Sequence, residues 1–237
     1  ICGRFILTGS QIFQVMKGVS ESLAGRIAIF DLYPLMWDEL CQAERLTENP
    51  SGLDQLLDLF IKGFYPEVHT KNPLNLDLWF RTYIRTYIER DVRDIKAIVD
   101  LSRFQVFMQV LAARVGRLVN YSEISKEVGI SVSTAKDWLS ILEATYITRL
   151  LQPFHSNMNK RLVKSPKLYF VDTGLLCHLL GLFSKDQIEK SPFKGFIFEN
   201  LLVLEAIKTL ETQLSPQKCY FYKTANNLEV DLVLATT

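Results

Sequence analysis

Hydrophobic and polar positions along the chain follow two periods, and each period predicts its own kind of element. Apolar side chains at helical spacing predict helices over residues 11–23, 53–63, 76–99, 104–113 and 196–210. Short runs of β-branched and aromatic residues predict strands over residues 4–8, 26–30, 146–151, 167–171, 220–223 and 229–234. The strand–helix–strand order at the start is typical of the end of a parallel α/β sheet.

Residues 120–142 have the spacing of a helix-turn-helix motif. Gly129 separates two short amphipathic helices, for which Ser122 and Ser131 are the expected N-caps. The strands expected over 146–151 and 167–171 would form the hairpin of a winged version. Between residues 122 and 146 two lysines stand against four acids, so both a DNA-reading motif and a packing module stay open.

The segment 155–167, called the basic segment below, has four basic residues and no acidic one. These residues are Lys160, Arg161, Lys164 and Lys167. Together with Lys136, on the second helix of the motif, they are candidate contacts for the phosphates of duplex DNA. The alternative is a solvated loop that offsets acidic residues elsewhere.

Carboxylates near the end of the sequence suggest half of a metal site. Glu229 and Asp231 alternate on one predicted strand, so both point to the same face. If Glu199 on the preceding helix lies against Asp231, the two form a sensible Mg²⁺ half-site. The alternative is that Glu229 is a surface residue and Asp231 caps or pairs with a lysine such as Lys223. A metal nuclease also needs a lysine on a neighbouring strand, which we expect to lie beyond this chain.

Polar residues follow the first predicted strand. Thr8 and Ser10 stand where open α/β sheets place groups that contact ligands, and Arg26 opens the next strand. The alternative is that Thr8 and Ser10 cap the following helix and Arg26 covers a sheet edge. The sequence contains neither G-x-G nor G-x-x-x-x-G-K-[ST], so we do not expect this chain alone to bind ATP tightly.

Composition limits the class of protein. With 48% hydrophobic and 22% charged residues, the 237-residue chain has the make-up of an ordinary globular protein. The 27 basic and 26 acidic residues nearly cancel, so net charge favours no partner. Four scattered cysteines suit a reducing cytoplasm, and no apolar run approaches the ~20 residues that span a membrane. Because the sequence opens on Ile1 and an apolar run, we expect a piece of a longer protein.

Short motifs recur here in the order in which one known family has them. They are Arg4–Ser10, Glu21–Arg26, Lys62–Glu67, Tyr87–Asp91, Lys164–Leu175, Phe198–Glu199 and Glu229–Leu234. Over nearly its whole length the chain resembles the predicted AAA-superfamily ATPases of bacteria and archaea. Those proteins carry a C-terminal domain of unknown function related to PD-(D/E)XK nucleases.

The resemblance implies a division into four parts. Residues 1–45 would end the parallel AAA-type core, and 46–115 would be a helical lid. Residues 116–155 would be the winged helix-turn-helix, and 156–237 a truncated α+β domain of the restriction-endonuclease type. Glu199 and Asp231 would then be the first acid and the aspartate of the nuclease pattern, whose E-x-K part does not follow Asp231 in this sequence.

The resemblance also implies a function. The longer protein would bind ATP and Mg²⁺ through Walker motifs upstream of this chain. Thr8 or Ser10 would be the sensor, and Arg26 the arginine finger that reaches a neighbouring subunit of a homo-oligomer. The chain would be the C-terminal part of an ATPase that couples ATP binding and hydrolysis to a DNA or protein partner. Two alternatives stay open, a Mg²⁺-dependent nuclease-like domain and a non-enzymatic DNA-binding or assembly module.

Overall fold

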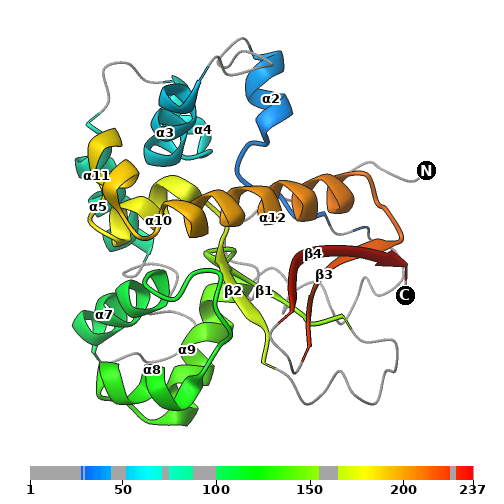
Figure 1. The fold of residues 1–237 in the computed structure, drawn as a ribbon. Coiled ribbons are helices and arrows are strands. Elements are labelled where there is room, and N and C mark those ends of the chain that lie inside the picture. The colour runs from blue at the N-terminus through cyan, green and yellow to red at the C-terminus, as the bar shows by residue number, and fades with distance from the viewer. Residues whose placement is uncertain are drawn as a thin grey trace.

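The computed structural model describes residues 28, 30–43, 52–70, 75–87, 100–154, 165–224 and 228–236, and these form a mixed α/β fold with many helices and two small antiparallel sheets (Figure 1). The described helices are α2 (Trp37–Gln42), α3 (Leu53–Lys62), α4 (Pro66–Thr70), α5 (Leu76–Tyr87), α7 (Leu101–Ala112), α8 (Tyr121–Val128), α9 (Val132–Ala144), α10 (Thr173–Leu179), α11 (Lys185–Lys190) and α12 (Lys194–Thr212). The described strands are β1 (Thr148–Leu151), β2 (Lys167–Phe170), β3 (Gln217–Lys223) and β4 (Glu229–Thr236).

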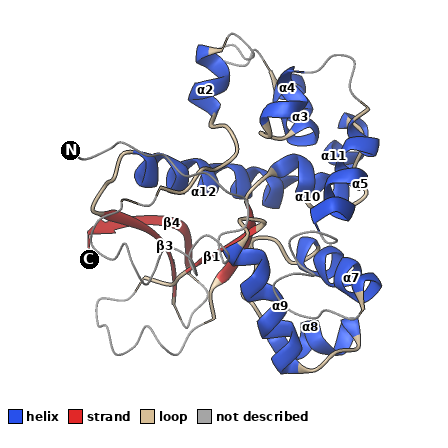
Figure 2. Ribbon diagram, turned by 180° about the vertical axis from the view of Figure 1, so that it is seen from behind, coloured by secondary structure: helices blue, strands red, loops and turns tan. Residues whose placement is uncertain are grey.

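The long helix α12 crosses the middle of the molecule. Helices α2, α3 and α4 lie on one side of it, while α7, α8, α9 and both sheets lie on the other (Figures 1 and 2). The sequence of α12 explains its central position. Its apolar residues recur every three or four positions, and Ile197, Leu201 and Leu204 among them are buried. None of the helices in the described part of the chain is long and apolar enough to cross a membrane.

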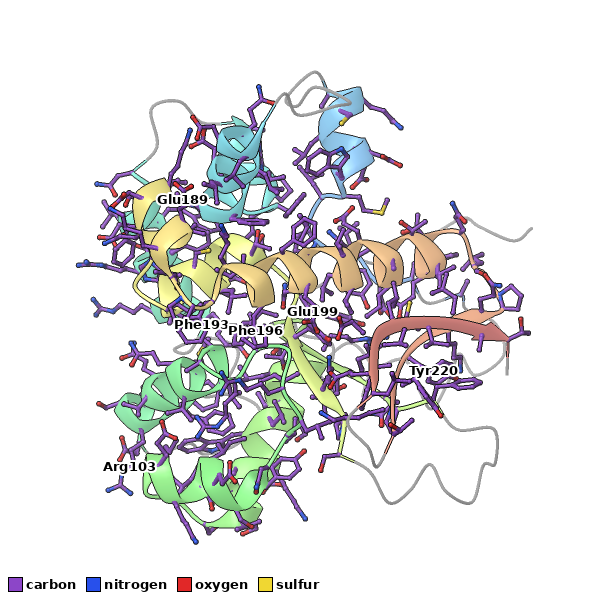
Figure 3. All side chains as sticks on the ribbon, viewed as in Figure 1. Arg103, Glu189, Phe193, Phe196, Glu199 and Tyr220 are labelled. Carbon is purple, nitrogen blue, oxygen red and sulfur yellow. The ribbon has the colours of Figure 1, made fainter. Side chains whose placement is uncertain are left out.

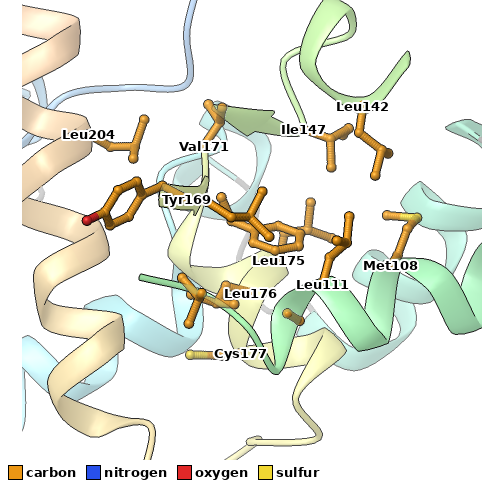
Figure 4. Packing of buried hydrophobic residues seen from close by; sticks show 14 of the residues in the cluster. Met108, Leu111, Leu142, Ile147, Tyr169, Val171, Leu175, Leu176, Cys177 and Leu204 are labelled. Atoms are coloured by element: carbon orange, nitrogen blue, oxygen red, sulfur yellow. The ribbon is translucent and has the colours of Figure 1, made fainter. Parts of the chain in front are cut away.

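One hydrophobic core joins these elements. Tyr169 and Val171 on and after β2 pack with Leu175 of α10, and Leu204 of α12 belongs to the same cluster (Figure 4). Leu111 of α7 belongs to this core, and buried residues of α8 and α9 complete it. The core therefore runs across the boundaries predicted at residues 115/116 and 155/156.

The expected helix-turn-helix residues fold as two helices, α8 and α9. Gly129 ends α8 in the left-handed conformation, with φ of 74°. The cap predicted at Ser131 is confirmed, since its side chain accepts a 3.0 Å hydrogen bond from Thr134 N. The cap predicted at Ser122 is wrong, because the Asn120 side chain accepts from the Ser122 and Glu123 N–H groups and the cap lies two residues earlier than predicted.

Both expected hairpins are present. β1 pairs antiparallel with β2, with Thr148 opposite Phe170, and Leu118 adds an isolated bridge to the start of β2. β3 pairs antiparallel with β4. The register of this pair shifts between Tyr220 and Tyr222, so Asp231 and Leu232 of β4 lie opposite the single residue between them on β3, as in a β-bulge.

Other predicted elements differ in extent. α7 begins at Leu101, three residues before the predicted start, because the Asp100 side chain caps it by accepting a hydrogen bond from Arg103 N. α3 ends at Lys62, one residue before the predicted end, and α12 extends beyond its predicted bounds at both ends. The elements predicted between residues 4 and 30 lie almost wholly outside the described residues, and both described sheets are antiparallel.

Candidate functional site

A buried lysine gathers three carboxylates where β2, α12 and β4 meet. The Lys167 ammonium nitrogen lies 3.1 Å from Glu199 Oε1, 2.5 Å from Glu229 Oε1 and 2.8 Å from Asp231 Oδ1. We call these four residues the carboxylate–lysine cluster. The Lys167 side chain is only 3% exposed, whereas Asp231 at 57% lies at the solvent side. Figure 3 shows Glu199 projecting from α12 toward the sheets.

The β2 side of the cluster is set by alternation along the strand. Lys167 and Tyr169 are two residues apart and therefore face the same way. The Tyr169 hydroxyl donates a 2.6 Å hydrogen bond to Glu199 Oε1. Asn200 fixes α12 against this strand, since its amide accepts from Phe170 N at 2.7 Å and donates to Phe170 O at 2.8 Å. Glu199 is thereby held next to Lys167.

The β4 side is set by Glu229 and Asp231, which the strand alternation predicts to share one face. Both carboxylates reach Lys167, and Asp231 is part of the bulge. Lys223 on β3 donates a 2.7 Å hydrogen bond to Glu229 Oε2. The lysine that pairs with Asp231 is Lys167, while Lys223 binds Glu229.

The charges of the cluster stabilise one another. Burial by itself lowers the pKa of Lys167, but hydrogen bonds to the three carboxylates outweigh burial and raise the pKa above its ordinary value. Burial by itself raises the pKa of Glu229. The hydrogen bonds from Lys167 and Lys223 outweigh burial and hold the pKa below its ordinary value. Burial, followed by the hydrogen bond to Glu199, raises the pKa of Tyr169, which stays a proton donor.

The predicted Mg²⁺ half-site can be tested against this geometry. Across the described residues, no three His, Cys, Asp or Glu side chains are arranged to hold a metal ion. Glu199 Oε1 and Asp231 Oδ1 do come together, but both bind the ammonium of Lys167. As these side chains lie, the residues do not fit a divalent ion.

The candidate DNA contacts have different surroundings. Lys136 is exposed on α9, with its ammonium 5.7 Å from the centre of the Tyr121 ring. Lys167 is buried in the cluster and does not present its charge to solvent, unlike the exposed lysine that the composition of the basic segment led us to expect. Lys160, Arg161 and Lys164 lie outside the described residues.

A second polar arrangement ties the N-terminal part of the chain to α12. Residues 33–37, called the strap, contact successive turns of this helix in antiparallel order. The Tyr33 hydroxyl donates to Glu211 Oε2 at 2.6 Å. Leu35 O accepts from Lys208 Nζ at 2.9 Å, and Trp37 N donates to Glu205 Oε2 at 2.9 Å.

The strap is also held from its other side. Leu35 N donates a 2.9 Å hydrogen bond to Phe64 O, in the turn after α3. The ammonium of Lys208 lies 2.5 Å from Glu205 Oε1 and 4.7 Å from the centre of the Phe64 ring. The Lys208 side chain is only 2% exposed. Thr8, Ser10 and Arg26, the predicted nucleotide-contacting residues before the strap, lie outside the described residues.

Sequence reasoning missed Tyr169, Glu205 and Lys208, and it assigned Lys167 to the candidate DNA contacts. The sequence does indicate that Lys167 and Tyr169 share one face of the strand, because these two residues with polar ends alternate with the apolar residues Leu168 and Phe170. Lys208 and Glu205 are three apart on α12, which is visible in the sequence. Their partners in the strap are not, because they lie far away along the chain.

Comparisons with known proteins place these sites in context. An AAA domain matches residues 2–41, which include the whole strap. The uncharacterized protein Rv2008c of Mycobacterium tuberculosis is 30% identical over 230 residues, which are 97% of this chain and 49% of that protein. The uncharacterized protein Mb2031c of Mycobacterium bovis matches with the same identity and coverage. The chain thus spans about half the length of the curated relatives it matches.

No solved structure matches the chain significantly. The family described as domain of unknown function DUF8612 matches residues 53–186, which run from α3 into α11. The matched region is more than half of the chain and contains Lys167 and Tyr169. The chain therefore belongs to this family, the domain of unknown function DUF8612.

Proposed function

We propose that this chain is the C-terminal part of an AAA-type ATPase and that it couples ATP binding and hydrolysis to duplex DNA. The observation that carries the proposal is the strap. Residues 33–37 belong to the segment that matches an AAA domain, and they are hydrogen-bonded along α12 through Glu205, Lys208 and Glu211.

The coupling path follows from these contacts. A displacement of the AAA-type segment would reach α12 through the strap, because both backbone and side-chain groups are bonded there. Helix α12 also carries Glu199 and Asn200, which bind side chains and backbone of β2. β2 pairs with β1, the strand that follows α9. A nucleotide-dependent shift at residues 33–37 would therefore move the hairpin relative to its surroundings.

The nucleotide site belongs to the longer protein in this proposal. ATP and Mg²⁺ would bind to Walker motifs upstream of this chain, with Thr8 or Ser10 as the sensor. Arg26 would stabilise the transferring phosphoryl group in a neighbouring subunit, which requires a homo-oligomer.

DNA is the partner class that the order of the elements and the basic segment favour. Helices α7, α8 and α9 are followed by the β1–β2 hairpin, and Leu118 bridges to β2. This is the element order of a winged helix-turn-helix. The connection between β1 and β2 contains Lys160, Arg161 and Lys164 without an acid, and Lys136 is exposed on the second helix of the motif. Such a wing would contact the DNA backbone.

ATP turnover by the complete gene product that contains this chain tests the proposal. Arg26→Ala is expected to lower turnover by about 10³-fold or more, the usual contribution of an arginine finger. Arg81→Ala is the matched control, because Arg81 is an exposed arginine paired with Asp77 on α5. Duplex DNA is expected to change turnover in the wild-type protein. No turnover in wild type, or equal turnover in both variants, would contradict the proposal.

A further inference from the structure

We propose that Lys167 is the resident cation of the carboxylate–lysine cluster, and that its ammonium takes the place of a divalent ion between Glu199, Glu229 and Asp231. The cluster then joins β2, α12 and β4 without metal. Removal of the ammonium would free the three carboxylates to close around a divalent cation, which they are not arranged to hold as they lie. This inference concerns metal chemistry of the C-terminal region and does not depend on the proposed ATPase function.

The first argument is geometric. An ammonium has three N–H donors and no acceptor. Lys167 has three carboxylate oxygens within 3.1 Å, one from each acid, so each donor has its own partner. Oxygens from three carboxylates are also the donor set that hard divalent cations prefer. The same oxygens cannot serve both cations at once.

The second argument is charge. The three acids carry three negative charges, and Lys167 and Lys223 bring two positive ones, which leaves the group at −1. Without Lys167 the group would be at −2, with Lys223 still bound to Glu229. Since the Lys167 side chain is only 3% exposed, water that enters its place cannot fully screen the negative charges of the three carboxylates. The vacated position would therefore attract a divalent cation strongly.

The third argument is access. Asp231 is 57% exposed, whereas Glu199 is 18% exposed, so the cluster is open to solvent on its β4 side. A cation in a Lys167 variant would reach the three oxygens from that side. In the wild-type chain one oxygen of each carboxylate already binds the ammonium.

Terbium luminescence is the direct probe, because Tyr169 donates a hydrogen bond to Glu199 and would lie close to a lanthanide bound there. The wild-type chain and the Lys167→Met variant are titrated with Tb³⁺, which prefers the same oxygen ligands as Ca²⁺. Lys167→Met is expected to show saturable, Tyr-sensitised emission at concentrations at least about ten-fold lower than wild type, a difference of about 1.4 kcal/mol or more. Lys167→Met/Glu199→Gln/Asp231→Asn is expected to lose it.

The matched control is Lys190→Met. Lys190 is an exposed lysine on α11 whose ammonium pairs with one carboxylate, that of Asp186. Its removal is expected to leave terbium emission at the wild-type level. Equal emission from Lys167→Met and Lys190→Met would overturn the proposal.

A second measurement covers the case in which Lys167→Met does not fold. The melting temperature of the wild-type chain is followed with Mn²⁺ and, separately, with a chelator. The proposal expects no saturable stabilisation by Mn²⁺ and no loss of stability with the chelator. Stabilisation by Mn²⁺ that disappears in Asp231→Asn would overturn it, because the wild-type cluster would then be a metal site.

Discussion

The carboxylate of Asp172 accepts a 2.6 Å hydrogen bond from the backbone N–H of Phe64, 108 residues earlier in the chain. The same carboxylate caps α10 by accepting a 2.7 Å bond from Leu175 N. Two of the motifs singled out in the sequence, Lys62–Glu67 and Lys164–Leu175, thus meet in one buried contact. This contact joins the end of α3 to the start of α10 and stands beside Lys208, which holds the strap.

Gly63 makes room for this contact, and its replacement gives the first prediction. A Cβ at Gly63 would lie 2.5 Å from Asp172 Oδ1, and the φ of 70° is left-handed. Gly63→Ala is therefore expected to lower the free energy of unfolding by more than the about 1–3 kcal/mol that left-handed strain alone costs. Urea unfolding measures the loss.

Gly181→Ala is the control for Gly63→Ala. Gly181 also has a left-handed φ, of 72°, but a methyl group added to it would meet no atom within 4 Å, so only strain acts there. The difference between the two variants isolates the clash with Asp172. Equal losses would show that the carboxylate moves away without cost.

The second prediction concerns pH. Burial raises the pKa of Asp172 from 3.8 to about 6, although backbone hydrogen bonds and Lys208 act in the opposite direction. The folded state thus holds a proton that the unfolded state releases between these values. The contribution of Asp172 to stability is complete below pH 4 and is lost as the pH rises through about 6, on the order of 3 kcal/mol.

Asp172→Asn removes this titration and keeps an acceptor oxygen. The free energy of unfolding, measured in urea from pH 4 to 7, is expected to fall less with rising pH in Asp172→Asn than in wild type. Asp186→Asn, at an exposed aspartate on α11, is expected to reproduce the wild-type slope. A slope in Asp172→Asn as steep as that of wild type would assign the pH dependence to other groups.

The third prediction concerns the strap. Lys208→Met removes the hydrogen bond to Leu35 O and the charge next to Glu205, while it keeps an apolar stem of similar length. We expect the free energy of unfolding to fall by about 1.5–3 kcal/mol, the usual range for hydrogen bonds of a charged group. Lys185→Met is the control, because Lys185 pairs with Asp58 in an exposed site.

The same variant reports on coupling in the complete gene product. If the strap carries the nucleotide signal, Lys208→Met is expected to reduce the change in ATP turnover caused by duplex DNA more than it reduces turnover without DNA. A proportional loss of both rates would give Lys208 a structural role only.

Local patterns predict most elements, and residue Lys167 shows where they fail. Helices α8 and α9 and both hairpins follow from spacing, glycine and cap residues within a few positions. Lys167 belongs by composition to the basic segment, but it is the first residue of β2 and turns inward. Its partners Glu199 and Asp231 lie 32 and 64 residues further on, so only the tertiary fold brings them together.

Helix α10 escapes prediction for a different reason. Its residues Thr173 to Cys177 are all buried, so the helix has no polar face and no amphipathic period. The strap shows the same limit for loops. An extended segment that contacts α12 through two backbone groups and one hydroxyl leaves no periodic signal in the sequence.

The last prediction tests whether Lys160, Arg161 and Lys164 of the basic segment contact DNA. Each phosphate contact by a basic side chain contributes about 0.9 to the slope of log affinity against log salt. If Lys160, Arg161 and Lys164 contact the backbone, their joint replacement by glutamine is expected to weaken duplex binding and to lower that slope by about 3. Fluorescence anisotropy with one labelled duplex at several salt concentrations measures both quantities.

The control replaces Lys185, Lys190 and Lys194 by glutamine, which removes the same charge from α11 and the start of α12. Because these residues lie outside the basic segment, the slope is expected to stay at the wild-type value. A similar drop in both triple variants would mean that DNA affinity depends on net charge and that Lys160, Arg161 and Lys164 are not the contact. An unchanged slope in the variant of these three residues, with binding retained, would transfer the contact to the exposed face of α9 around Lys136.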